Sequence, residues 1–125
     1  MKLIRGIHNL KSRLPTCVAT IGNFDGVHLG HQHVIKQLKA VAEIRNQPTV
    51  VLIFEPQPVE FFIPQQAPRR LSRLRDKIKQ MTDVGIDYLV CLQFNRQLAN
   101  LSAEDFVRKI LVERLNIKHL VIGDD

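Results

Sequence analysis

Two histidines and three glycines gather in one short stretch of the chain, and their residue types could hold a phosphate chain. Gly22, Gly26 and Gly30 recur every fourth residue, and His28 and His31 stand three residues apart. In a helix start, three-residue spacing brings both imidazoles to one side. Backbone N–H groups and the helix dipole also converge on an anion at such a start. The stretch therefore predicts a binding site for a polyphosphate.

Two plainer interpretations of this stretch stay open. The glycines would only supply positive φ angles in a tight strand-to-helix connection, and the histidines would be solvated polar residues. Alternatively, His28, His31 and His33 would form a metal cluster. The metal interpretation is the weaker one, because neither Cys nor a carboxylate lies nearby at ligand spacing. We expect the protein to hold no metal ion by itself.

The elements that must position these residues alternate between strands and helices. Four apolar runs are nearly continuous, as is typical of strands covered on both faces: Cys17 to Ile21, Thr49 to Phe54, Tyr88 to Leu92 and His119 to Ile122. Helical patterns separate them, with apolar stripes over residues 34–42, from Leu71 to Met81, and from Phe106 to Leu115 after a capping pair of Ser102 and Asp105.

This alternation predicts an α/β fold with a parallel sheet of at least four strands, flanked by helices and joined by right-handed crossovers. Ligands in such sheets bind beyond the carboxyl ends of the strands, at the point where the strand order reverses. We expect that point after the run Cys17 to Ile21, which is the first of the four and leads into the histidine stretch.

One connection is longer than compact domains usually allow, at about 16 residues. It runs from Glu55 to Arg70, carries four prolines and shows no sustained periodicity, so it predicts a flap over a ligand. Phe62 is a candidate ring contact for a flat aromatic substrate, whereas we expect Phe61 to pin the flap to the core. A cationic run follows, and most of it is expected to face solvent while one or two members steer a phosphate: Arg69, Arg70, Arg73, Arg75 and Lys77.

Composition fits one ordinary globular domain of 125 residues, with 45% hydrophobic residues. Lys and Arg outnumber Asp and Glu by 18 to 12, which favours anionic partners such as nucleotides. Nucleic acid is the weaker inference, because no aromatic platform or basic recognition helix accompanies the charge. Cys17 and Cys91 lie in apolar runs and are expected to be reduced, buried thiols in a reducing cytoplasm. No signal peptide or membrane span is expected.

Several motifs resemble one family. His28-Leu29-Gly30-His31 matches the His-x-Gly-His signature of adenylyl- and cytidylyltransferases, and the run from Gly22 to His31 resembles the form found in bacterial FAD synthetases. Residues 1–6, 54–58 and 121–125 resemble the same family in order and spacing. The resemblance implies a Rossmann-like nucleotidyltransferase: an FMN adenylyltransferase domain over residues 1–125, incomplete at its C-terminus, with the riboflavin kinase domain of such proteins lying outside it.

The resemblance also assigns roles to single residues. It implies that His28 and His31 are catalytic. It also implies that these two histidines bind the nucleotide together with Gly22, Asn23, Phe24, Asp25 and Gly30. It assigns to the flavin Asn23, Pro56, Pro58, Phe62 and Asp125. Gln57 stands where many members of the family have histidine.

The implied reaction transfers the adenylyl group of ATP to FMN and gives FAD and pyrophosphate, with Mg²⁺ carried mainly by the phosphates. Two alternatives stay open. Another transferase with the His-x-Gly-His signature would act on nicotinate mononucleotide, phosphopantetheine or glycerol phosphate. A binding module would hold nucleotide or flavin without turnover.

Overall fold

The computed structural model describes residues 1–9, 13–24, 29–66 and 73–123. Within these ranges the strands form one parallel sheet of five, in the order β1-β4-β3-β2-β5. The strands are β1 (Lys2–Arg5), β2 (Cys17–Ile21), β3 (Thr49–Phe54), β4 (Tyr88–Leu92) and β5 (Ile117–Val121). The helical elements are η1 (Ile7–Asn9), α1 (Leu29–Arg45), α2 (Pro58–Phe62), η2 (Pro64–Gln66), α3 (Leu74–Asp83), α4 (Arg96–Ala99), α5 (Ala103–Asp105) and the π-helix η3 (Phe106–Arg114).

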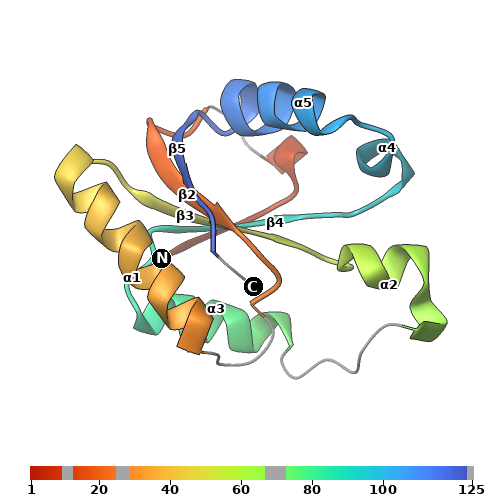
Figure 1. Ribbon diagram of the computed structural model, residues 1–125, viewed down its shortest axis with the longest axis horizontal. Helices are drawn as coiled ribbons and strands as arrows, with labels where there is room; N and C mark the ends of the chain where they lie inside the picture. The colour runs from red at the N-terminus through yellow and green to blue at the C-terminus, as the bar shows by residue number, and fades with distance from the viewer. Residues whose placement is uncertain (10–12, 25–28, 67–72, 124–125) are drawn as a thin grey trace.

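Helices cover both faces of the sheet, so the central strands are buried on each side. Figure 1 shows α1 and α3 on one face and α5, continuing into η3, on the other. In β3, Val51 and Ile53 pack toward α1 and α3, where they meet Met81. The alternate residues of β3 pack on the other face against Leu111 and Leu115. This two-sided burial explains why the strand sequences are nearly continuous in hydrophobicity.

The strand order reverses at β2, as the sequence predicts. From β2 the chain adds β3 and then β4 on one side, and β5 returns to the other side of β2. The predicted parallel α/β sheet is therefore confirmed. However, β2 is the second strand, because Lys2–Arg5 adds β1 at the edge beside β4. Charged residues at both ends hide this short edge strand from an apolar-run search.

The predicted helices occur with some changes. The first begins at Leu29, and the second at Leu74, since Leu71 lies outside the described residues. The predicted cap is confirmed: Ser102 Oγ accepts a hydrogen bond from the backbone N–H of Asp105 at 3.0 Å. The carboxylate of Asp105 accepts from Arg108 instead, and this hydrogen bond lowers the pKa of Asp105.

The stretch after this cap differs from an ordinary α-helix. Residues Phe106–Arg114 form a π-helix, and the N–H of Leu115 donates to the carbonyl of Ile110, five residues back. Neither the capping pair nor the apolar stripe distinguishes a π-helix from an α-helix.

The connection after β3 is more ordered than its four prolines suggest. It contains the short helical elements α2 and η2, which the lack of sustained periodicity did not predict. The start of α2 has a local cause: the Glu60 carboxylate accepts from the backbone N–H of Gln57 at 2.8 Å, and Pro58 takes the first helical position. Arg69 and Arg70 lie outside the described residues.

A clasp of hydrogen bonds ties β3 to β4 at the amino ends of the strands. Asp87 Oδ2 accepts from the backbone N–H of Thr49 at 2.8 Å and from its hydroxyl at 3.0 Å, while the N–H of Asp87 donates to Thr49 Oγ1 at 2.9 Å. This clasp fixes the register of the sheet at the edge opposite the predicted site.

Cys17 and Cys91 form no disulfide and are buried, as expected. Burial raises the pKa of the Cys17 thiol to about 11, since the thiolate is disfavoured away from water. Among the helices of the described residues, none has the length and apolar character needed to cross a membrane.

Candidate active site

The carboxyl ends of β2, β3 and β5 meet at one edge of the sheet and define the candidate site. Ile21 of β2 pairs with Leu52 of β3, and Thr20 pairs with Val121 of β5, so the three strands end close together. The N–H of Gly22 then donates to the carbonyl of Leu52 at 3.1 Å, which extends the pairing one residue past β2. Segments far apart in the sequence thus leave the sheet side by side.

Phe24 links the exit of β2 to the first turn of α1. Its ring is 2% exposed, and its backbone takes a left-handed conformation with φ at 50°. The rings of Phe24 and His31 lie with their centroids 4.8 Å apart, tilted by 45°. A buried aromatic ring thus holds the half-buried imidazole of His31 at the start of α1, near the end of β2.

The glycine before Phe24 is required by this arrangement. A Cβ at Gly22 would stand 2.8 Å from Cε2 of Phe24, closer than real Cβ contacts come. Close approach, instead of a positive φ, explains the glycine at this position. Gly22, Phe24 and His31 therefore form one packed unit, defined here as the β2-exit unit.

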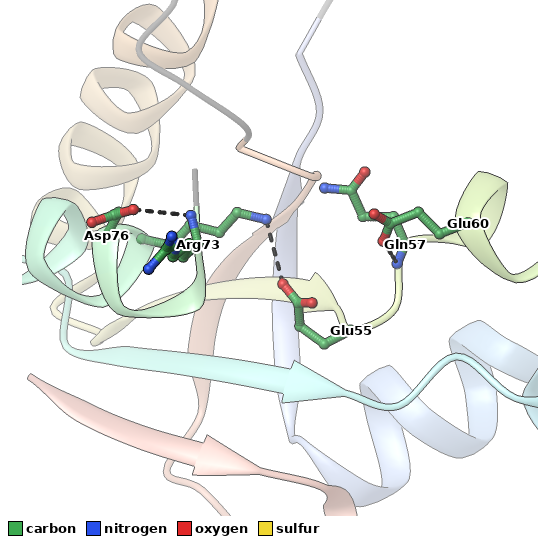
Figure 2. A network of polar contacts seen from close by, with 6 residues as sticks. Glu55, Gln57, Glu60, Arg73 and Asp76 are labelled. Carbon is green, nitrogen blue, oxygen red and sulfur yellow. Dashed lines mark hydrogen bonds and ion pairs between the residues drawn. The ribbon is translucent and has the colours of Figure 1, made fainter. Parts of the chain in front are cut away.

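A charged pair lies at the exit of the neighbouring strand β3. The ammonium of Lys77, on α3, is fully buried and stands 3.6 Å from Oε1 of Glu55, whose side chain is 20% exposed. The dashed line that ends at Glu55 in Figure 2 is this ion pair. Gln57 lies two residues further on, 6% exposed, and its Nε2 donates no hydrogen bond within the described residues.

The burial of Lys77 is an exception to the expectation that most of the cationic run faces solvent. Arg73 and Arg75 are exposed as expected, but Lys77 occupies a core position of α3. The sequence held a signal for this: residue 77 falls on the same helical stripe as Leu74, Ile78 and Met81. A lysine on an apolar stripe is the feature that sequence reasoning missed.

Comparison with known proteins shows the family of the chain. The FAD synthetase family model matches residues 10–125. The chain belongs to the FAD synthetase family. It is 50% identical over 127 residues to the bifunctional riboflavin kinase/FMN adenylyltransferase of Escherichia coli K12, and 50% identical over 125 residues to the protein of that name from Pseudomonas fluorescens. Each alignment covers the whole chain and 40% of the relative, so the chain spans about two fifths of the length of these relatives.

A solved structure has the same fold. It is that of a protein named as a macrolide-efflux protein from Streptococcus pneumoniae, and it matches with a TM-score of 0.81 and 22% sequence identity. The match covers 98% of this chain and 48% of that one. At this identity the likeness concerns the fold alone, and it agrees with the parallel α/β sheet described above.

The site residues that the FAD synthetase resemblance assigns are only partly covered by the structure. Asp25, His28 and Asp125 lie outside the described residues, so their predicted roles stay predictions. Gly30 lies in the first turn of α1 and Pro58 opens α2. Asn23 and Pro56 are exposed next to the exits of β2 and β3.

Aromatic rings gather over the exit of β3, where the family resemblance assigns the flavin. Phe61 packs against Phe94, in the segment after β4, with a centroid distance of 5.6 Å. Phe62 packs at 5.6 Å from the same ring but stays 56% exposed. Phe54, at the end of β3, completes the cluster at 5.6 Å from Phe94. Sequence reasoning named Phe61 and Phe62 but missed Phe94.

Two cavities open in the part of the chain that the structure describes. One of about 430 Å³ lies at the carboxyl ends of β1 and β4 and is lined by residues that include His8, Asn95 and Lys109. The other, of about 360 Å³, lies between α1 and α3 and includes Phe24 and His31 in its wall. The described residues hold no cluster of three or more His, Cys, Asp or Glu side chains fit for a metal ion.

Proposed function

We propose that this chain is the FMN adenylyltransferase part of a longer protein and transfers the adenylyl group of ATP to FMN. Membership of the FAD synthetase family and the names of the similar proteins support this assignment. The observation that carries it is the β2-exit unit, in which Phe24 holds His31 at the start of α1, beside the strand end where α/β sheets bind ligands. In this proposal riboflavin phosphorylation belongs to a separate domain outside residues 1–125.

The proposed reaction is one in-line displacement. A phosphate oxygen of FMN attacks the α-phosphorus of Mg²⁺-bound ATP and forms a new P–O bond. The bond between the α-phosphorus and the bridging oxygen breaks, and pyrophosphate leaves with that oxygen. Because the FMN phosphate is already ionised and nucleophilic, the chain needs neither a general base nor a covalent intermediate. Positioning and charge stabilisation must then supply the acceleration.

The chain's own groups would act on the phosphates. The imidazoles of His31 and His28 would donate hydrogen bonds to phosphoryl oxygens, and the start of α1 would add the positive end of its dipole. Gly22 lets the backbone run close to the nucleotide. The exposed ring of Phe62 offers a flat apolar face for the flavin. We place this chemistry in the cytoplasm, with Mg²⁺ entering as part of the nucleotide substrate.

The test compares three histidine variants in the intact protein. His31→Ala and His28→Ala should each lower the rate of pyrophosphate release from ATP and FMN by about 10²-fold, as for loss of one pre-placed donor. His33→Ala is the matched control, because His33 is exposed on the same helix and should leave the rate unchanged. Riboflavin phosphorylation should survive all three substitutions.

Two results would contradict the proposal. If the rate of His31→Ala stays within a few-fold of the parent, the β2-exit unit takes no part in the chemistry. If the parent protein binds ATP and FMN but releases no pyrophosphate, the chain is a binding module. Transfer of label from ATP to nicotinate mononucleotide or phosphopantetheine would instead identify a different acceptor.

A further inference from the structure

The buried lysine on α3 occupies a position where a charge is costly. Lys77 is 0% exposed, its Nζ donates no hydrogen bond within the described residues, and the distance of 3.6 Å to Glu55 Oε1 exceeds hydrogen-bond length. Desolvation of an ammonium is costly, and a loosely held ion pair offsets this cost only in part. A cation near the N-terminus of a helix is also opposed by the helix dipole. An apolar residue would suit this core position better.

The place of this charge in the fold suggests what it does. The backbone N–H of Glu55 donates to the carbonyl of Leu92, so Glu55 continues the sheet just beyond β3. The adjacent strand β2 leads into the β2-exit unit, with Gly22 paired to Leu52 of β3. A carboxylate therefore stands at the strand ends where the proposed substrates bring several negative charges. Like charges within several ångströms of each other repel appreciably inside a protein.

We propose that Lys77 is a positioning residue for anionic substrates: its buried ammonium offsets the carboxylate of Glu55 at the exit of β3. This inference rests on the proposed function. Whatever further partners Glu55 has, loss of the Lys77 charge makes the net charge at the exit of β3 more negative by one unit. The ammonium need not touch the phosphates, because a charge in a poorly screened interior acts over several ångströms.

Four variants of the intact protein test this. Lys77→Met keeps the length and apolar stem of the side chain and removes the charge, so the KM for Mg²⁺-bound ATP and for FMN should rise about tenfold with a smaller change in kcat. Glu55→Gln removes the opposing charge and should not raise either KM. The double variant should return both KM values to within about threefold of the parent. Lys79→Met is the matched control, because Lys79 lies on the same helix with an 81% exposed side chain.

The asymmetry between the two single variants separates this role from a structural one. A structural ion pair predicts that Lys77→Met and Glu55→Gln damage the enzyme alike, and equal rises in KM would overturn the inference. A KM for Lys77→Met within twofold of the parent would also overturn it. If Lys77→Met does not fold, the Glu55→Gln variant tests the proposal by itself. A KM above that of the parent contradicts the proposal, and a KM equal to or below that of the parent supports it.

The proposed function has its own readout in this experiment. A parent protein that releases no pyrophosphate from ATP and FMN refutes the proposed function, and the inference with it. An active parent whose Lys77→Met variant keeps the KM values of the parent refutes the inference alone.

Discussion

Gly22→Ala should slow the proposed adenylyl transfer by displacing Phe24 and, through its ring, His31. The new Cβ would lie 2.8 Å from Cε2 and 3.2 Å from Cδ2 of Phe24, whereas ordinary contact begins at 3.4 Å. The ring must therefore move by at least about half an ångström, and it is 2% exposed, so overpacking should cost about 1–3 kcal/mol of stability. His31 rests on that ring and must move with it. Displacing a group that positions the substrate by about 1 Å can lower the rate by about 10²-fold. We therefore expect kcat to fall by roughly 10- to 100-fold.

The assay is pyrophosphate release by the intact protein at saturating ATP and FMN, measured beside thermal unfolding. Gly85→Ala is the matched control. Gly85 has φ at +85°, so alanine there is also strained, by about 1–2 kcal/mol, but it precedes β4 at the amino ends of the strands and is not part of the β2-exit unit. A kcat for Gly22→Ala within threefold of that for Gly85→Ala would refute the reasoning, because the loss would then follow stability and not the position of His31.

Three further predictions concern parts of the fold away from the site. Asp87→Ala removes the acceptor of two hydrogen bonds from Thr49, so the free energy of unfolding in urea should fall by about 2 kcal/mol with kcat unchanged; an unchanged unfolding midpoint would show that the clasp is dispensable. In a Cys91→Ala background, Cys17 should react with a thiol reagent at pH 8 far more slowly than in the unfolded chain. Burial raises the pKa of Cys17 from 9.0 to about 11, so the contribution of this thiol to folding stability should be complete below pH 9 and be lost as the pH rises from there toward 11. Rapid labelling of the folded protein would contradict the burial of this thiol.

The parts of the fold that sequence patterns predicted are those in which residue type and position agree. The runs that became β2, β3 and β4 are apolar on both faces, and the cap at Ser102 uses a side chain whose preference matches the geometry. The edge strand β1 and the short helix α2 fail this condition. Lys2–Arg5 carries charges that an edge tolerates, and α2 depends on a local pairing of Glu60 with Gln57 amid prolines.

The sequence predicts site chemistry where a residue type implies it directly, as for His31 beside the glycines. That chemistry is hidden where the meaning lies in the combination of type and position. Lysine is ordinary on a helix, and the stripe of α3 is ordinary for a helix packed on a sheet. Only Lys77 on that stripe is unusual, because a core position selects against charge unless a second requirement retains it. Since the carboxylate 3.6 Å away lies at the exit of β3, electrostatics at the strand ends is the requirement that both residues share.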